Sequence, residues 1–187
     1  STIYGSGAMG GTINIITKRG KPGFQKNAFY NTGSYGTHNL GYSLGGADNN
    51  SDFYVGLERF TTDGISAMSH NDEKDEYKNH SLVANYGYKF SDAVKFRTNY
   101  RFIDAKLEYD SINDDYPDDL DNSHEKESAF GINFLYQPSE KFTNNFNFTN
   151  AYSSRTGNGI KSSFVNQFQK NGYWSYRTDL AYQGIYN

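Results

Sequence analysis

Apolar and polar residues alternate with a period of two along most of the chain after residue 33. The alternation is clearest in Ser81–Phe90, where one face carries Leu82, Ala84, Tyr86, Tyr88 and Phe90. The other face is polar or small, apart from Val83. Successive side chains of a β-strand point to opposite sides, so this pattern predicts a strand with one apolar and one polar face.

Eight further segments follow the same pattern, which gives nine predicted strands and an all-β fold. The nine segments are about 26–34, 38–47, 51–62, 81–90, 94–109, 130–136, 142–152, 162–169 and 174–186. Within 94–109 the apolar parity changes at Ala105, which we interpret as a β-bulge near a rim of the sheet. On the polar side, Lys95, Arg97, Arg101, Arg177 and Asp179 are expected to satisfy one another.

Tight and long connections alternate between these segments. Tight turns are predicted at 47–51, 91–93, 138–141 and 170–172, and longer connections at 63–77, 110–123 and 153–161. Only 34–37 is short where a long connection is expected. Short turns at one end and long loops at the other are typical of an outer-membrane barrel, although a β-sandwich remains an alternative. Segments of about 10 to 15 residues also match the roughly 9 to 11 that cross a bilayer at a tilt.

An odd number of strands cannot close an antiparallel barrel, so we expect the chain to be part of a larger one. Aromatic residues gather near the predicted strand ends, where they would form interfacial girdles or pack in an ordinary core. These residues are Tyr54, Phe90, Tyr109, Tyr136, Phe142, Tyr152, Tyr173 and Trp174.

The composition favours a barrel over a helical or disordered chain. A mean hydropathy of -0.83 is low, yet 17% of the residues are aromatic, which is more than a disordered segment carries. A barrel between lipid and water reconciles the two values, because every second residue is polar. No apolar run approaches the roughly 20 residues that a membrane-spanning helix needs.

Several functional classes are disfavoured by the residue types. The net charge of -3 comes without a basic cluster, so nucleic acid is not an expected partner. Cysteine is absent, which excludes thiolate metal sites. The four histidines lack the spacing of a zinc site, and no Ser/His/Asp set follows a recognisable motif, so we do not expect an enzyme.

The N-terminal stretch contains a formal G-x-G-x-x-G at Gly5, Gly7 and Gly10. A dinucleotide-binding motif needs a strand before these glycines and a helix after them. Here the β-branched stretch Thr12–Thr17 follows, and it favours a strand. We therefore reject a nucleotide site.

The stretch Tyr4–Lys18, YGSGAMGGTINIITK, resembles the closing segment of the plug domain of TonB-dependent outer-membrane receptors. The resemblance implies that residues 1–20 are the C-terminal end of a plug and that 21–187 are the N-terminal part of a transmembrane antiparallel β-barrel. Such barrels have 22 strands and a plugged lumen. It also implies that the protein lies in the lipid of the outer membrane and carries out active transport. TonB would be its partner, through a plug segment preceding Ser1.

Within this family the spacing of the first strands and two acidic loops resemble the cobalamin receptors. Eleven of the 21 acidic residues lie in Asp63–Glu76 and Asp110–Asp121, with Lys74 as the only Lys or Arg among them. Ca²⁺ takes 6 to 8 oxygen ligands, which aspartates from two neighbouring loops can supply. The resemblance implies four candidate calcium ligands, which are Asp72, Asp75, Asp110 and Asp121. The first two are spaced one residue wider than the family's Asp-x-Asp pair; the alternative is that both loops are simply solvated.

Four functions follow from these observations. Uptake of cobalamin or another corrinoid is the leading one, with uptake of an iron-siderophore as the nearest alternative. A passive porin would have no plug, and the stretch Gly5–Thr17 argues against it. A soluble β-sandwich adhesin would refold in buffer without detergent, which distinguishes it from the other three.

Overall fold

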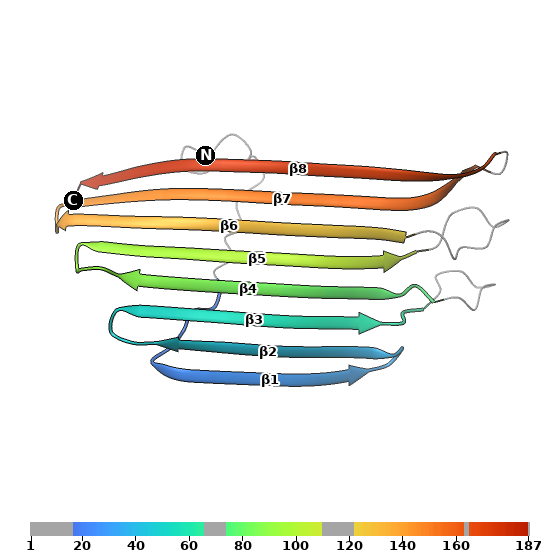
Figure 1. Cartoon of the computed structure of the whole chain (residues 1–187), viewed down its shortest axis with the longest axis horizontal. Helices are drawn as coiled ribbons and strands as arrows, with labels where there is room; N and C mark the ends of the chain where they lie inside the picture. Colours follow the sequence, from blue (N-terminus) through green and yellow to red (C-terminus); the bar gives the residue numbers. More distant parts are fainter. Residues whose placement is uncertain (1–16, 66–73, 110–121, 163–164, 187) are drawn as a thin grey trace.

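A computed structural model describes residues 17–65, 74–109, 122–162 and 165–186, and these form one eight-stranded antiparallel sheet (Figure 1). Each strand pairs with the next one along the chain. The strands are β1 (Gly23–Gly33), β2 (Thr37–Ala47), β3 (Ser51–Thr62), β4 (Tyr77–Lys89), β5 (Val94–Glu108), β6 (Asn122–Ser139), β7 (Phe142–Ser162) and β8 (Val165–Tyr186). The part of the chain in these ranges includes no helix that could span a membrane.

The sheet is a single layer. Strands contact only their sequence neighbours, and β1 and β8 are separate open edges in the described structure. Ala105 is the one buried apolar residue among those described, whereas large side chains such as Trp174 and Leu180 are 73% and 81% exposed. A sandwich needs two packed sheets with a core between them, so the described strands do not form one.

The register places the apolar residues of neighbouring strands on one face. Leu57 of β3 lies opposite Leu82 of β4, which lies opposite Phe102 of β5. Farther along the sheet, Phe134 of β6 packs on Phe146 of β7, with ring centroids 6.5 Å apart. Such cross-strand pairs are the local unit of sheet stabilisation, and here nothing in the described structure covers them.

The opposite face is polar, as the alternation predicts. It carries asparagines and charged residues such as Asp52, Asn85 and Arg97. The amide of Asn133 on β6 donates hydrogen bonds to the side-chain oxygens of Asn145 and Asn147 on β7. The sheet therefore separates an apolar surface from a polar one.

Short turns lie at one end of the sheet, at 48–50, 90–93 and 140–141 (Figure 1). The strand ends that flank residues 63–76 and 109–121 lie at the opposite end, together with the short β1–β2 turn. In that turn Tyr35 and Gly36 have φ of 59° and 62°, and Thr37 N donates to Ser34 O at 3.2 Å. Two consecutive positive φ values at the centre of the turn match the right-handed twist of the flanking strands.

The prediction of nine strands is wrong at the C-terminal end. Residues 153–161 were expected to be a loop, 162–169 a separate strand and 170–172 a turn. Instead β7 and β8 form one long hairpin in which Gly157 pairs with Asn171 and Asn158 with Lys170. Two stretches rich in turn residues lie opposite each other, and pairing overrides their local preference. With eight described strands, the odd-number argument for an incomplete barrel no longer holds.

The bulge predicted at Ala105 is also absent. The β4–β5 and β5–β6 registers run without a shift, and Ala105 pairs with Asn79 on one side and Glu125 on the other. The parity changes because the two faces exchange character toward this end of β5. Ile103 and Leu107 lie on the face that is polar from Lys95 to Arg101. The charged residues Asp104 and Lys106 lie on the opposite face.

Candidate functional site

A short N-terminal segment, Thr17–Gly20, is anchored on the polar face of the sheet. The hydroxyl of Thr17 donates to Oδ1 of Asn85 at 3.1 Å, and Nδ2 of Asn85 donates to the carbonyl of Lys18 at 2.9 Å. Asn85 is only 6% exposed, so both halves of a buried amide depend on this segment for partners. The contact holds the segment against the middle of β4.

The same segment approaches β2 and β3 at backbone distance. A Cβ on Gly20 would lie 2.1 Å from the carbonyl oxygen of Gly46 and 2.4 Å from that of Phe53, so no side chain fits here. Pro22 then forms a bridge with Ala47. Figure 1 shows the segment crossing behind β2 and β3 before β1 begins.

An ion pair spans three strands beside this crossing. The two terminal guanidinium nitrogens of Arg97 on β5, Nη1 and Nη2, donate to the carboxylate of Asp52 on β3, at 2.9 and 2.7 Å. Gly87 of β4 lies between them in the register, and a Cβ there would lie 2.4 Å from the Asp52 carboxylate. A bidentate pair of this kind fixes orientation as well as charge.

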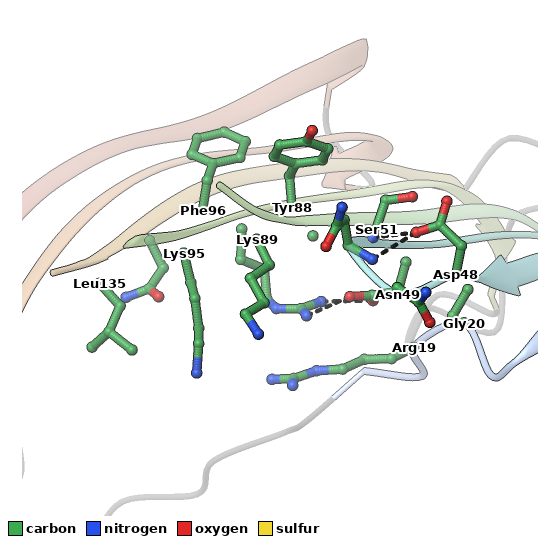
Figure 2. A pocket seen from close by; sticks show the side chains of 16 residues that line it. Arg19, Gly20, Asp48, Asn49, Ser51, Tyr88, Lys89, Lys95, Phe96 and Leu135 are labelled. Atoms are coloured by element: carbon green, nitrogen blue, oxygen red, sulfur yellow. Dashed lines mark hydrogen bonds and ion pairs between the residues drawn. The ribbon is translucent and has the colours of Figure 1, made fainter. Parts of the chain in front are cut away.

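These residues line an open pocket of about 490 Å³ at the short-turn end of the polar face (Figure 2). Its four cationic residues are Arg19, Lys89, Lys95 and Arg97, and its two acidic residues are Asp48 and Asp52. Figure 2 shows the side chains of Arg19, Lys89 and Lys95 on the same side of the pocket. Lys89 pairs with Asp92 in the turn, whereas Arg19 and Lys95 make no ion pair with another described residue. The pocket can therefore bind an anionic group.

Asp48 has a separate task in the β2–β3 turn. Its Oδ1 accepts hydrogen bonds from the backbone amides of Asn50 and Ser51, at 2.8 and 2.6 Å. These amides favour the ionised carboxylate and lower the pKa of Asp48 below its usual value. The aspartate therefore stabilises the turn more strongly in its charged form.

Sequence reasoning predicted part of this polar face. Arg177 donates to Asp179 on the same strand, as expected, while Arg97 and Arg101 pair with Asp52 and Glu127, which were not predicted as partners. The role of Asn85 was missed, because in the pattern it is one of several polar residues on β4. Its one distinguishing feature is burial, which comes from a segment far away in the sequence.

Three of the four candidate calcium ligands, Asp72, Asp110 and Asp121, lie outside the described residues. Asp75 is half-buried next to the start of β4. In the described ranges no group of three or more His, Cys, Asp or Glu residues is arranged to hold a metal. The bases of the two acidic loops do lie side by side, since the amide of Glu108 donates to the carbonyl of Glu76 at 2.9 Å.

Comparison with known proteins adds no family to this picture. No protein-family model matches the chain, and no curated protein matches it either. The resemblance of Tyr4–Lys18 to a receptor plug is therefore a prediction from those residues alone. Most of that stretch precedes the described residues, which include only Thr17 and Lys18 of it.

Proposed function

We propose that the chain is part of the transmembrane barrel of an outer-membrane receptor that takes up a large, scarce nutrient with energy delivered through TonB. The observation that carries this proposal is the single-layer sheet with an uncovered apolar face. A soluble sheet buries its apolar face against another layer. Lipid is the surrounding that makes such a layer unnecessary.

The dimensions of the apolar face suit a bilayer. On β5 it extends from Val94 to Phe102, about 27 Å along the strand at 3.4 Å per residue. Barrel strands tilt by about 40°, which reduces this to about 21 Å, close to the apolar band of about 25 Å in outer-membrane barrels. Aromatic pairs such as Tyr88 with Phe90 lie at the short-turn edge of the band.

The segment on the polar face favours a receptor over a passive porin. In a barrel the polar face of the sheet is the lumen, and Thr17–Gly20 is held there by Asn85 and by close backbone contact at Gly46. This is where the end of a plug domain would enter the barrel. The stretch that resembles a plug, Tyr4–Lys18, runs into this segment.

The substrate proposed is cobalamin or a related corrinoid, with calcium ordering the two acidic loops. This choice rests on the acidic residues of Asp63–Glu76 and Asp110–Asp121, whose bases are adjacent. An iron-siderophore receptor is the alternative when the loops bind no calcium. TonB would act on a plug segment, and the pocket at Arg19 and Lys95 would lie at the periplasmic end of the lumen.

The membrane part of the proposal is tested with two neighbouring residues of β6. Residues 1–187 contain no cysteine, so Phe130→Cys and Ala129→Cys each place one labelling site within them, on opposite faces of the sheet. In the full-length gene product, reconstituted in vesicles, brominated lipids should quench a fluorophore at position 130 and spare one at position 129. Equal quenching at both sites would contradict a lipid-facing sheet.

The proposed substrate is tested by equilibrium binding of labelled cobalamin to the same full-length product in outer membranes. Binding is measured with calcium present and then chelated. Tight, calcium-dependent binding is the expected result. Loss of binding in both conditions, with the lipid quenching intact, would move the substrate to a siderophore or another ligand. It would also return the aspartates to ordinary solvated loops.

A further inference from the structure

Cationic residues gather on the apolar face of the sheet, immediately beyond its apolar band toward the long-loop end. The first cross-strand row there is Arg59, His80, Asp104 and Lys126, on β3 to β6. The next row contains Lys78, Lys106 and His124. We call the six basic residues that β3 to β6 contribute to these two rows the rim patch.

The apolar band and the rim patch are adjacent on this face of the sheet, with no row of residues between them. The row of the band next to the patch is Leu57, Leu82 and Phe102, which contains no charge. Across the boundary the polar face changes in the opposite sense, so that Ile103 replaces the charged Arg101 there. On β5, the charged part of the outward face thus begins where the inner face becomes apolar.

The patch has more positive than negative charge. Its two rows contain four Lys or Arg residues and a single acid, Asp104, which already contacts His124 at 2.8 Å and Lys126 at 3.8 Å. Lys78 pairs with Glu76, and Glu108 follows Lys106 at the strand end.

Three of the six basic residues are not engaged in ion pairs with described residues. Arg59, His80 and Lys106 are exposed and make no ion pair with another described residue. Lys106 lies directly opposite Lys78 on the neighbouring strand. Like charges in such a cross-strand pair repel one another, so an anion placed over them would relieve a cost already present in the sheet.

We propose that the rim patch binds the phosphate groups of an anionic lipid whose acyl chains lie on the apolar band. Guanidinium and ammonium groups form their strongest hydrogen bonds with phosphate and carboxylate. Only an amphiphile offers a phosphate next to acyl chains, which matches a charged row bordering an apolar one. The proposal rests on the proposed function, because it needs the band to face lipid.

Binding is measured on the full-length gene product in neutral detergent micelles containing diphosphoryl lipid A, with phosphatidylcholine and inorganic phosphate as comparison probes. The test variant is Arg59→Gln/Lys106→Gln, which removes two exposed and unpaired charges. The matched control is Lys21→Gln/Lys141→Gln, which removes two exposed charges at the short-turn end. The test variant should bind lipid A about tenfold more weakly or worse, and the control should bind as the parent does.

Each outcome decides something. Equal affinity of parent and test variant for lipid A would overturn the proposal, as would inorganic phosphate competing at the affinity of the lipid. Equal weakening in the control would also overturn it, since the effect would then be net charge. Lipid quenching at position 130 separates the two hypotheses: if quenching persists while the patch fails, only the patch is wrong, and if quenching fails, the membrane assignment fails too.

Discussion

Asp52 and Arg97 form a two-point ion pair across β4, directly over Gly87. The two residues are two strands apart, so the pair links β3 to β5 independently of the backbone ladder. Their side chains are 21% and 27% exposed, which shields the pair from part of the solvent screening. Few charged contacts in the sheet are this closely held.

We predict that this pair contributes measurably to stability. A double-mutant cycle of Asp52→Asn and Arg97→Gln should give a coupling free energy of about 1–2 kcal/mol, from urea unfolding of the reconstituted full-length product. The control is the more exposed Arg101–Glu127 pair at 3.6 Å. Its coupling should be about 0.5 kcal/mol or less, and equal values for both pairs would show that the two-point geometry adds nothing.

Gly87→Val should destabilise the sheet, although valine is ordinarily favoured in strands. A Cβ at this position would meet both the Asp52 carboxylate and the Arg97 guanidinium, at 2.4 and 2.6 Å. The expected cost is about 1–3 kcal/mol, and most of it should vanish in an Asp52→Ala/Arg97→Ala background. Gly172→Val is the control, since its Cβ would meet nothing closer than 3.8 Å. A similar loss there would attribute the effect to strand glycines in general.

Alternation in the sequence predicted the two faces of the sheet and most strand boundaries, because a period of two is a local property of each strand. For β2 and β3 the predicted and observed ends agree closely. The long β7–β8 hairpin was not predictable in this way. Gly157 and Asn171 are turn formers when considered alone, and only their pairing with each other keeps them in strands.

The site was harder to predict than the fold for a related reason. Asp52, Gly87 and Arg97 are far apart in the sequence, and the register alone brings them into one row. At Ala105 a bulge and an exchange of character between the faces produce the same parity change, so the sequence could not distinguish them. The partners of Asn85 come from a segment that crosses the sheet, which no periodicity in β4 encodes.

Asn85→Ala should loosen the N-terminal segment from the polar face. Loss of the two hydrogen bonds to Thr17 and Lys18 removes the side-chain anchor of this segment, at a cost of about 1–3 kcal/mol. The peptide bonds after Lys18 and Arg19 are trypsin sites, so limited trypsin digestion should cut there several times faster. Asn99→Ala, at an exposed position on the same face, is the control. Unchanged cleavage in Asn85→Ala would mean that backbone contact at Gly20 alone holds the segment.

The β2–β3 turn should weaken only at low pH. The pKa of Asp48 is lowered in the folded state by the amides of Asn50 and Ser51, so its stabilising contribution is complete above the ordinary aspartate pKa of 3.8. That contribution is lost as the pH falls through the lower folded-state value. Asp48→Ala should therefore be less stable than the parent at pH 7, and the difference should close below about pH 4. A difference that stays constant down to pH 2 would contradict an ionised cap.

Calcium should protect the two acidic loops from proteolysis in the full-length product. Eleven acidic residues in Asp63–Glu76 and Asp110–Asp121 repel one another, and the hydrogen bond between Glu108 and Glu76 keeps the two loop bases together. A divalent cation relieves this repulsion, and aspartate oxygens from both loops suit its flexible geometry. We expect chelation to increase cleavage within both loops several-fold. The variant Asp110→Asn/Asp121→Asn should be cleaved quickly with or without calcium, while Glu140→Gln, in the turn at the opposite end, should behave as the parent does. Protection that survives in the aspartate variant would assign the calcium to other ligands.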